Sequence, residues 1–267
     1  MTANLEAGIN QPILLRQDDR GVVTLTLNRP AQFNSLSKDM LTALQAALDA
    51  VALDRTARVV VIAGAGKAFC AGHDLKEMRA NRDRVFIKSL FDECSRMMLT
   101  ITRLPQPVIA RVHGIATAAG CQLVGMCDLA VAAETAQFAT SGIRVGLFCA
   151  TPGVAVSRNV SRKRVLEMLL TGEFINARTA LDFGLVNRVV PQEELDSEVR
   201  RLVDSVIAFP PEAIALGKRL FYRQIDMGIE DAYAEASETM AQNMMLDETA
   251  EGIDAFIGKR APEWRGR

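Results

Sequence analysis

The sequence predicts a layered α/β core followed by a C-terminal helical region. Strand and helix patterns alternate in the first half of the chain, and beyond Val190-Pro191 only helical patterns are found. Such alternation is typical of a sheet covered by helices. The chain has 267 residues, 49% of them hydrophobic, which is enough to bury a core of this kind. We expect residues 1–200 to form the α/β domain and residues 201–267 the helical region.

The first strand and helix patterns lie close to the N-terminus. Val22–Leu27 is rich in β-branched residues and is ended by an Asn-Arg-Pro sequence, so it predicts a strand. Ser37 is expected to cap the next helix, because apolar residues recur at helical spacing over Met40–Val51. Val59–Ile62 is continuously apolar, as in a strand that is buried on both faces.

The strand Val59–Ile62 leads into a loop and a helix. Gly64–Gly72 predicts the loop because it holds three glycines, and Val85–Thr102 has the spacing of a helix. A second strand–loop–helix unit follows about fifty residues later, with a strand at Pro107–Ala110, a turn at Gly114–Gly120 and a helix at Cys121–Met126. Further short strands are expected at Leu129–Ala133 and near Phe138.

Beyond Val190-Pro191 four helices are predicted, separated by proline, glycine and aspartate. They are expected at Glu193–Phe209, Glu212–Ile225, Ile229–Leu246 and Glu248–Lys259. The third carries a stripe of methionines, Met240, Met244 and Met245. Because methionine packs adaptably, this stripe belongs either to the core of the chain or to a contact between subunits.

Charge and hydropathy exclude several classes of protein. Lys plus Arg total 31 and Asp plus Glu total 32, so no overall charge attracts nucleic acid or an anionic membrane, and neither partner is predicted. No apolar run reaches the ~18 residues of a membrane-spanning helix. The N-terminus lacks a basic region followed by an apolar one, so we expect a cytoplasmic protein. In a eukaryote the mitochondrial matrix is the alternative, although no clear transit peptide is present.

The cysteines and histidines predict neither a disulfide scaffold nor a metal site. The five cysteines have no C-x-x-C spacing, which is typical of free thiols in a reducing compartment. The only two histidines, His73 and His113, do not form an H-E-x-x-H motif. We therefore expect no bound metal.

Nucleotide-binding and hydrolase motifs are also missing. Gly64-Ala65-Gly66-Lys67 is not a P-loop, because alanine follows the lysine and no glycine stands five residues before Gly66. G-x-G-x-x-G fails because Phe69 occupies the place of the third glycine. No G-x-S-x-G sequence occurs, so nothing supports an α/β-hydrolase.

Two loops at predicted strand ends are the more informative feature. They cover Lys67–Met78 and His113–Leu123, and each contains a run of small residues. Small residues let a backbone approach a ligand closely, and helix N-termini leave amide N–H groups unpaired. Two such amides directed at one point can hold the oxygen of a thioester while it becomes an enolate.

Three separated motifs make the chain similar to a known family. FCAGHDLKEM (69–78), AAGCQL with the downstream CDLAVAA (127–133), and EGIDAFIGKRAPEW (251–264) resemble the enoyl-CoA hydratase/isomerase (crotonase) superfamily. The match runs from about Val22 to the C-terminus. The resemblance implies an α/β spiral of ββα units, a C-terminal helical region that trimerises, and a homotrimer or a hexamer of two trimers. It also implies acyl-CoA thioester substrates, with coenzyme A as part of the substrate and no other cofactor.

The resemblance also implies roles for particular residues. The amides that hold the thioester oxygen fall on His73 and Ala119. Phe256 and Lys259 match a pair that in relatives reaches the CoA of a neighbouring subunit. All the implied contacts with the substrate are Arg29, Phe33, Ala68, Ala71, Asp74, Leu75, Gly120, Phe256 and Lys259.

The chain departs from the family where hydratases carry their catalytic acids. Hydratases hold a water between two glutamates, and these positions are Gln122 and Gly142 here. A glutamine orients a water but does not take its proton at neutral pH, and glycine has no side chain. The aspartate that some dienoyl-CoA isomerases use corresponds to Ala150, and residues 135–153 contain no Asp or Glu.

Three functions therefore stay open. Hydration of a 2-enoyl-CoA is the reaction that the family implies by default. Decarboxylation or hydrolysis of an acyl-CoA depends less on paired glutamates, and a catalytically inactive, CoA-thioester-binding regulator needs none. The His73 imidazole is a candidate base, and Cys149 is either a nucleophile or a small buried hydrophobe. Asp128 and His113 are expected to serve structure.

Overall fold

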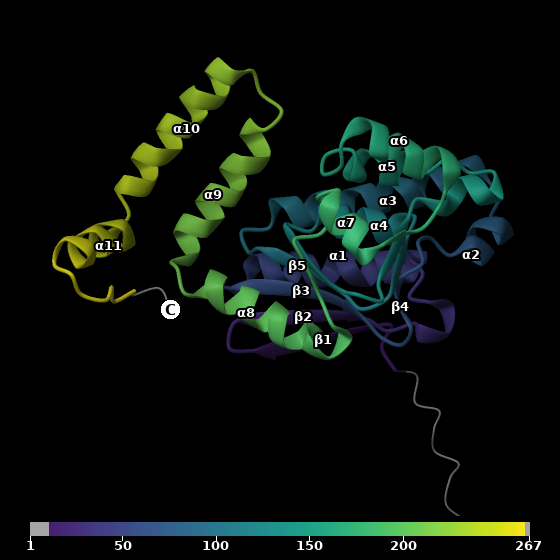
Figure 1. Cartoon of the computed structure of the whole chain (residues 1–267), viewed down its shortest axis with the longest axis horizontal. Helices are drawn as coiled ribbons and strands as arrows, with labels where there is room; N and C mark the ends of the chain where they lie inside the picture. The colour runs from purple at the N-terminus through teal and green to yellow at the C-terminus, as the bar shows by residue number, and fades with distance from the viewer. Residues whose placement is uncertain (1–10, 265–267) are drawn as a thin grey trace, which may run out of the picture.

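The computed structural model describes residues 11–264, in which two sheets are covered by helices. Figure 1 shows this layered part, with α9, α10 and α11 extending away from it to one side. The strands are β1 Leu14–Asp19, β2 Val22–Leu27, β3 Val59–Gly64, β4 Ala68–Cys70, β5 Val108–Val112, β6 Ile115–Thr117, β7 Leu129–Ala133, β8 Gln137–Ala139, β9 Ile175–Asn176 and β10 Arg188–Val190. The helices are α1 Lys38–Leu53, α2 Leu75–Ala80, α3 Arg84–Arg103, α4 Ala119–Met126, α5 Ala150–Val156, α6 Arg162–Thr171, α7 Ala177–Asp182, α8 Leu195–Ile207, α9 Pro211–Gln224, α10 Ile229–Met244 and α11 Asp247–Ile257.

The larger sheet has six strands in the order β1-β2-β3-β5-β7-β10. Only β1 is antiparallel to its neighbour, and the other strands pair in parallel. β3 is central, and its first five residues are buried, which explains its continuous apolar sequence. The predicted α/β class is confirmed, and β10 is the last strand, as the sequence indicates.

The smaller sheet is made of β4, β6, β8 and β9, and the sequence predicts it only in part. β4 lies within the predicted loop Gly64–Gly72, and β6 lies within the predicted turn Gly114–Gly120. Both predictions therefore missed a short strand. Each strand has three residues and pairs with a segment distant in the sequence. Local patterns do not record such pairing.

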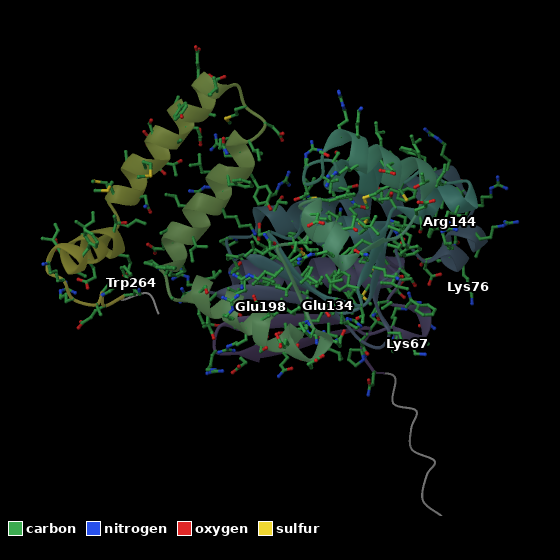
Figure 2. The ribbon with its side chains drawn as sticks, viewed as in Figure 1. Lys67, Lys76, Glu134, Arg144, Glu198 and Trp264 are labelled. Carbon is green, nitrogen blue, oxygen red and sulfur yellow. The ribbon has the colours of Figure 1, made fainter. Side chains whose placement is uncertain are left out.

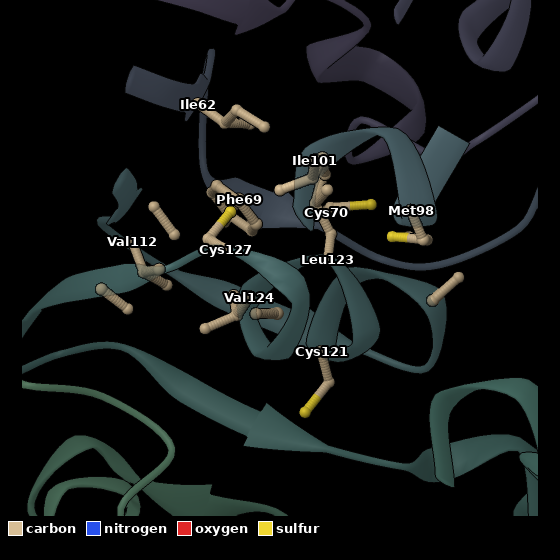
Figure 3. Packing of buried hydrophobic residues seen from close by; sticks show 14 of the residues in the cluster. Ile62, Phe69, Cys70, Met98, Ile101, Val112, Cys121, Leu123, Val124 and Cys127 are labelled. Carbon is tan, nitrogen blue, oxygen red and sulfur yellow. The ribbon is translucent and has the colours of Figure 1, made fainter. Parts of the chain in front are cut away.

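The helix predictions for the first half are confirmed with shifts of a few residues. The Ser37 side chain caps α1 by accepting a hydrogen bond from the Met40 N–H at 3.3 Å. α1 and α3 bury their apolar faces in the core, and α4 packs against α3 and α5. Figure 3 shows part of this core, in which Leu123 of α4 lies near Cys70 and Ile101.

The C-terminal helices extend from the larger sheet. α8 packs its buried side chains on one face of that sheet, and it runs across the expected boundary between residues 200 and 201. The methionine stripe on α10 is exposed, with 59% of Met240, 46% of Met244 and 79% of Met245 accessible. The stripe therefore does not belong to the core of the chain. Within residues 11–264, every helix is too short or too polar to cross a bilayer.

Candidate functional site

A cavity of about 450 Å³ lies where the two small-residue loops meet. It is bounded by α2, α3, the start of α4, the 3-10 helix η2 (Ser141–Val145) and the start of α5. Most of its lining side chains are apolar, among them Phe91, Leu147 and Phe148. A volume of this size accommodates a small organic group, and an apolar wall favours an acyl chain.

The predicted oxyanion-hole residues both line this cavity. Gly72 has a φ of +92°, and a Cβ at that position would lie 3.2 Å from the Ala119 nitrogen. Gly72 directly precedes His73, so the close approach brings the two predicted amides together. Within residues 11–264 neither the His73 nor the Ala119 N–H donates a hydrogen bond. Two free amides beside one apolar cavity form a candidate site for a developing oxyanion.

Ala118 holds the second amide through a strained backbone. It caps the start of α4 with φ 50° and ψ −119°, a region that alanine rarely adopts. Its N–H donates to the Ala139 carbonyl at 2.9 Å, so strand β8 helps to impose this conformation. Strain of this kind costs about 1–3 kcal/mol and clusters at functional sites. Sequence reasoning missed Ala118, because alanine gives no signal of a positive φ.

Gln122 lies one turn along α4 and is only 4% exposed. Its N–H donates to the Ala118 carbonyl at 3.0 Å. The side-chain oxygen is buried and accepts no hydrogen bond from the described residues. A buried acceptor without a partner is costly, and a neutral amide does not replace a carboxylate as a base.

Gly142 lines the cavity and is enclosed by the segment that follows it. Its carbonyl accepts a hydrogen bond from the Leu147 N–H at 3.0 Å, and its own N–H donates to Cys149 Sγ at 3.2 Å. A Cβ at residue 142 would lie 2.4 Å from the Leu147 oxygen and 2.7 Å from Cys149 Sγ. The space next to Gly142 is therefore already filled by a backbone carbonyl and a thiol.

Cys149 is a pocket thiol with little nucleophilic character. It lines the cavity and is 5% exposed. Burial raises the pKa of its thiol, which outweighs the stabilising hydrogen bond from the Gly142 N–H. The thiol is neutral at pH 7, which favours its interpretation as a small buried hydrophobe.

The His73 side chain stands at the cavity wall. Its Nδ1 lies 3.3 Å from the Leu36 carbonyl oxygen, and its ring meets that of Phe91 edge to face with centroids 5.1 Å apart. Nε2 is buried and has no hydrogen-bond partner among residues 11–264. Burial lowers the pKa of the imidazole, against the opposing effect of the Leu36 carbonyl.

One carboxylate does line the cavity, and it lies at the rim. Asp92 of α3 forms an i,i+4 ion pair with Lys88, and both side chains are largely exposed. Sequence reasoning did not single it out. An exposed carboxylate that is paired with a lysine differs in its surroundings from the enclosed glutamates of a hydratase.

The residues predicted to contact CoA fall into three groups. Ala71 and Leu75 line the cavity. Arg29 and Asp74 pair with each other at 3.1 Å, and Asp74 also caps α2 by accepting from the Lys76 and Glu77 N–H groups. Phe33 is exposed after β2, and Ala68 is buried in β4. Gly120 lies against the Cys70 carbonyl. Phe256 and Lys259 lie at the end of α11.

Figure 1 shows α11 and α2 at opposite ends of the molecule. Phe256 and Lys259 therefore lie far from the cavity of their own chain, and Phe256 is 85% exposed. A contact between these residues and a substrate would require the cavity of another subunit.

Asp128 and His113 take the structural places that the sequence predicts. Asp128 accepts hydrogen bonds from the Val108 N–H, from Lys218 and from Tyr222, and it connects α9 to the sheet. His113 lies outside the cavity, with Nε2 at 2.9 Å from the Gly66 oxygen.

Comparisons with known proteins agree with this fold. The family model described as enoyl-CoA hydratase/isomerase matches residues 17–267. The chain therefore belongs to the enoyl-CoA hydratase/isomerase, or crotonase, family, and its two mixed sheets and C-terminal helices form the crotonase fold.

Within the family, the motifs of residues 116–155 indicate the branch named enoyl-CoA hydratase domain-containing protein 3. The mitochondrial protein of that name from Xenopus laevis is 45% identical over 253 residues, covering 95% of this chain and 86% of its own. The crystal structure of the human protein is 42% identical with a TM-score of 0.93, covering 95% of this chain and 100% of that chain. A crystal structure of an enoyl-CoA hydratase from Mycobacterium smegmatis is 61% identical with a TM-score of 0.94, covering 95% of this chain and 99% of that chain.

Proposed function

We propose that this protein binds acyl-CoA thioesters and stabilises the enolate form of the acyl group between the backbone amides of His73 and Ala119. The observation that carries the proposal is the pair of free amides beside one apolar cavity. The amides would donate to the thioester oxygen, and the acyl chain would occupy the cavity. Both donors are fixed by the fold, so they need no reorganisation when negative charge develops.

The same cavity argues against efficient hydration of a 2-enoyl-CoA. Hydration needs a base that activates water and an acid that protonates the α-carbon. Gln122 is a neutral amide, and Gly142 is enclosed by Leu147 and Cys149. Formation of an enolate, by removal of an α-proton or of a carboxylate group, depends first on the two amides.

The CoA part of the ligand would lie where cationic side chains gather. Figure 2 shows Lys67, Lys76 and Arg144 on the same side of the molecule. Lys76 directly follows Leu75, and Arg144 belongs to η2, so two of these cations flank the cavity. Their charge suits the phosphate groups of CoA, which are anionic.

The exposed helices suggest how subunits assemble. Apolar residues are exposed along α9, α10 and α11, including Phe221, Tyr233 and Met245. A large apolar surface of this kind favours an interface, and the family implies a trimer or a hexamer of two trimers. We propose that residues 201–267 form this interface and present Phe256 and Lys259 to the CoA of a neighbouring subunit.

The proposed compartment is a reducing one. All five cysteines are buried and free. Free thiols fit the cytoplasm or the mitochondrial matrix, and the names of the vertebrate relatives describe those proteins as mitochondrial.

The test compares binding with three reactions. Calorimetry measures the binding of butyryl-CoA, and mass spectrometry in D₂O measures exchange of its α-hydrogens. Hydration is tested with crotonyl-CoA as the substrate, and decarboxylation is tested with methylmalonyl-CoA. Binding together with exchange or decarboxylation supports the proposal. Rapid hydration of crotonyl-CoA would show that the cavity holds an acid–base pair that we have not found. Binding without any reaction would favour a regulator, and absence of binding would remove the proposal.

A further inference from the structure

We infer that the acyl group held in this cavity is a hydrocarbon chain of about eight carbons whose far end carries no charge. The inference rests on the proposed function and names the class of acyl-CoA that the site takes. Three features of the molecule carry it: the volume of the cavity, the apolar side chains exposed on its wall, and the paired charges at its rim.

The cavity is larger than a short acyl group needs. A methylene group is close in size to a water molecule, whose share of liquid volume is ~30 Å³. A four-carbon butyryl group therefore fills roughly a quarter of the 450 Å³, and an eight-carbon octanoyl group roughly half. The remaining space is available to the thioester and to the pantetheine arm of CoA. A short acyl group would leave more of the apolar wall without contacts, which forfeits dispersion attraction.

Large apolar side chains are exposed on the cavity wall. Leu75 of α2 is 54% exposed, and Val145 and Phe148 are 65% and 45% exposed. Exposed apolar side chains that gather around a cavity are typical of a ligand-binding surface. An acyl chain that covers them would remove apolar surface from water, and the gain grows with each methylene that it places there.

The segment that presents Val145 and Phe148 is held in place by its own hydrogen bonds. The Leu147 N–H donates to the Gly142 carbonyl at 3.0 Å, and the Gly142 N–H donates to Cys149 Sγ at 3.2 Å. The apolar wall is therefore formed before a ligand arrives. A preformed wall lowers the ordering cost of binding, so a larger share of the hydrophobic gain appears as affinity.

The charges at the rim disfavour an acyl group with a charged far end. Lys88 is the only lysine or arginine among the described residues that line the cavity, and its Nζ donates to Asp92 Oδ1 at 2.7 Å. The hydroxyl side chains of the lining carry no charge. A carboxylate at the far end of the acyl group would therefore meet a cation that is already paired, and Asp92 would repel it. It would also lose part of its hydration beside the apolar wall.

The experiment compares four CoA thioesters by calorimetry on the full-length protein. Each fully buried methylene strengthens binding about fourfold, so the four further methylenes of octanoyl-CoA correspond to at most about 200-fold over butyryl-CoA. We expect octanoyl-CoA to bind at least 10-fold more tightly than butyryl-CoA. Hexanoyl-CoA and hexanedioyl-CoA have the same number of acyl carbons and differ in the carboxylate at the far end. We expect the hexanedioyl thioester to bind at least 10-fold more weakly than the hexanoyl thioester.

A variant with both Val145→Ser and Phe148→Ser makes the wall polar at two exposed positions. We expect it to bind octanoyl-CoA at least 10-fold more weakly than the wild type and to change butyryl-CoA binding less than threefold. Leu170→Ser is the matched control, because Leu170 of α6 is 63% exposed and lies outside the cavity lining. It should bind both thioesters like the wild type.

Three results would overturn this inference and leave the proposed function intact. They are equal affinities for butyryl-CoA and octanoyl-CoA, a hexanedioyl thioester that binds as tightly as the hexanoyl one, and an equal loss of both chain lengths in the double variant. Failure of the wild type to bind butyryl-CoA and octanoyl-CoA alike would instead overturn the proposed function.

Discussion

Gly142→Ala tests whether the place of the second hydratase carboxylate is closed. The new Cβ would lie 2.4 Å from the Leu147 oxygen and 2.7 Å from Cys149 Sγ, both closer than van der Waals contact. The carbonyl belongs to the backbone and cannot rotate away, so the 142–149 segment must shift. Overpacking costs about 1–3 kcal/mol. Alanine also lowers the conformational entropy of the unfolded chain, which offsets about 0.4–1 kcal/mol of that cost. We expect a net loss of roughly 1–2 kcal/mol in the free energy of unfolding.

Gly125→Ala is the matched control, because Gly125 of α4 is half-buried like Gly142. A Cβ there would meet its nearest neighbour, Asn159 Nδ2, at 3.5 Å, an ordinary contact. Gly125 lies within α4, so alanine should leave stability unchanged or raise it by up to ~1 kcal/mol. Urea unfolding followed by circular dichroism, at one protein concentration, separates the two variants. Equal stabilities for Gly142→Ala and Gly125→Ala would refute the reasoning.

The same closure predicts the behaviour of a variant with both hydratase carboxylates restored. Gln122→Glu, Gly142→Glu should not become an efficient crotonyl-CoA hydratase, because the second side chain has no room beside Leu147 and Cys149. Hydration of crotonyl-CoA, followed by its loss of ultraviolet absorbance, checks this. A large gain in rate would show that the 142–149 segment moves aside readily.

Three further outcomes are expected. Lys218→Met should cost about 3–5 kcal/mol in the free energy of unfolding in urea, because it leaves the buried Asp128 carboxylate without a counter-charge. Burial raises the pKa of Asp128, so the folded protein binds this proton more tightly than the unfolded chain does. The stability difference between the wild type and Lys218→Met should therefore shrink as pH falls. A difference that grows in acid would contradict this. Ala118→Gly should raise the free energy of unfolding by about 1 kcal/mol by relieving its positive φ, and a loss of stability would count against strain there. Because all five cysteines are buried, a thiol reagent should leave the native protein unlabelled, except for slow reaction at Cys149 that butyryl-CoA prevents; rapid labelling at another cysteine would contradict the burial.

How much the sequence could predict depended on how local each signal is. The Ser37 cap and the buried strand β3 follow from residues next to one another, and both are confirmed. β4 and β6 were missed because three residues form a strand only when a distant segment pairs with them. The helices α5, α6 and α7 lie between Phe138 and Glu193, where the sequence predicts no element.

In the candidate site, too, the features that depend on neighbouring residues were predicted, and those that depend on distant contacts were not. The resemblance of the two loop motifs to the family implies His73 and Ala119, and both line one cavity. The strain at Ala118 and the filled space beside Gly142 depend on backbone contacts between loops. Local sequence patterns do not predict such contacts. The unpaired Nε2 of His73 is likewise a property of packing, because it requires the Leu36 carbonyl on one ring nitrogen and no partner for the other.

A crystal structure with butyryl-CoA bound tests the central claim most directly. Butyryl-CoA has no double bond to hydrate, so the intact thioester can be observed. The account predicts its carbonyl oxygen at about 2.7–3.1 Å from the backbone nitrogens of both His73 and Ala119. A thioester oxygen bound elsewhere, or an acyl chain outside the cavity that these residues line, would contradict it.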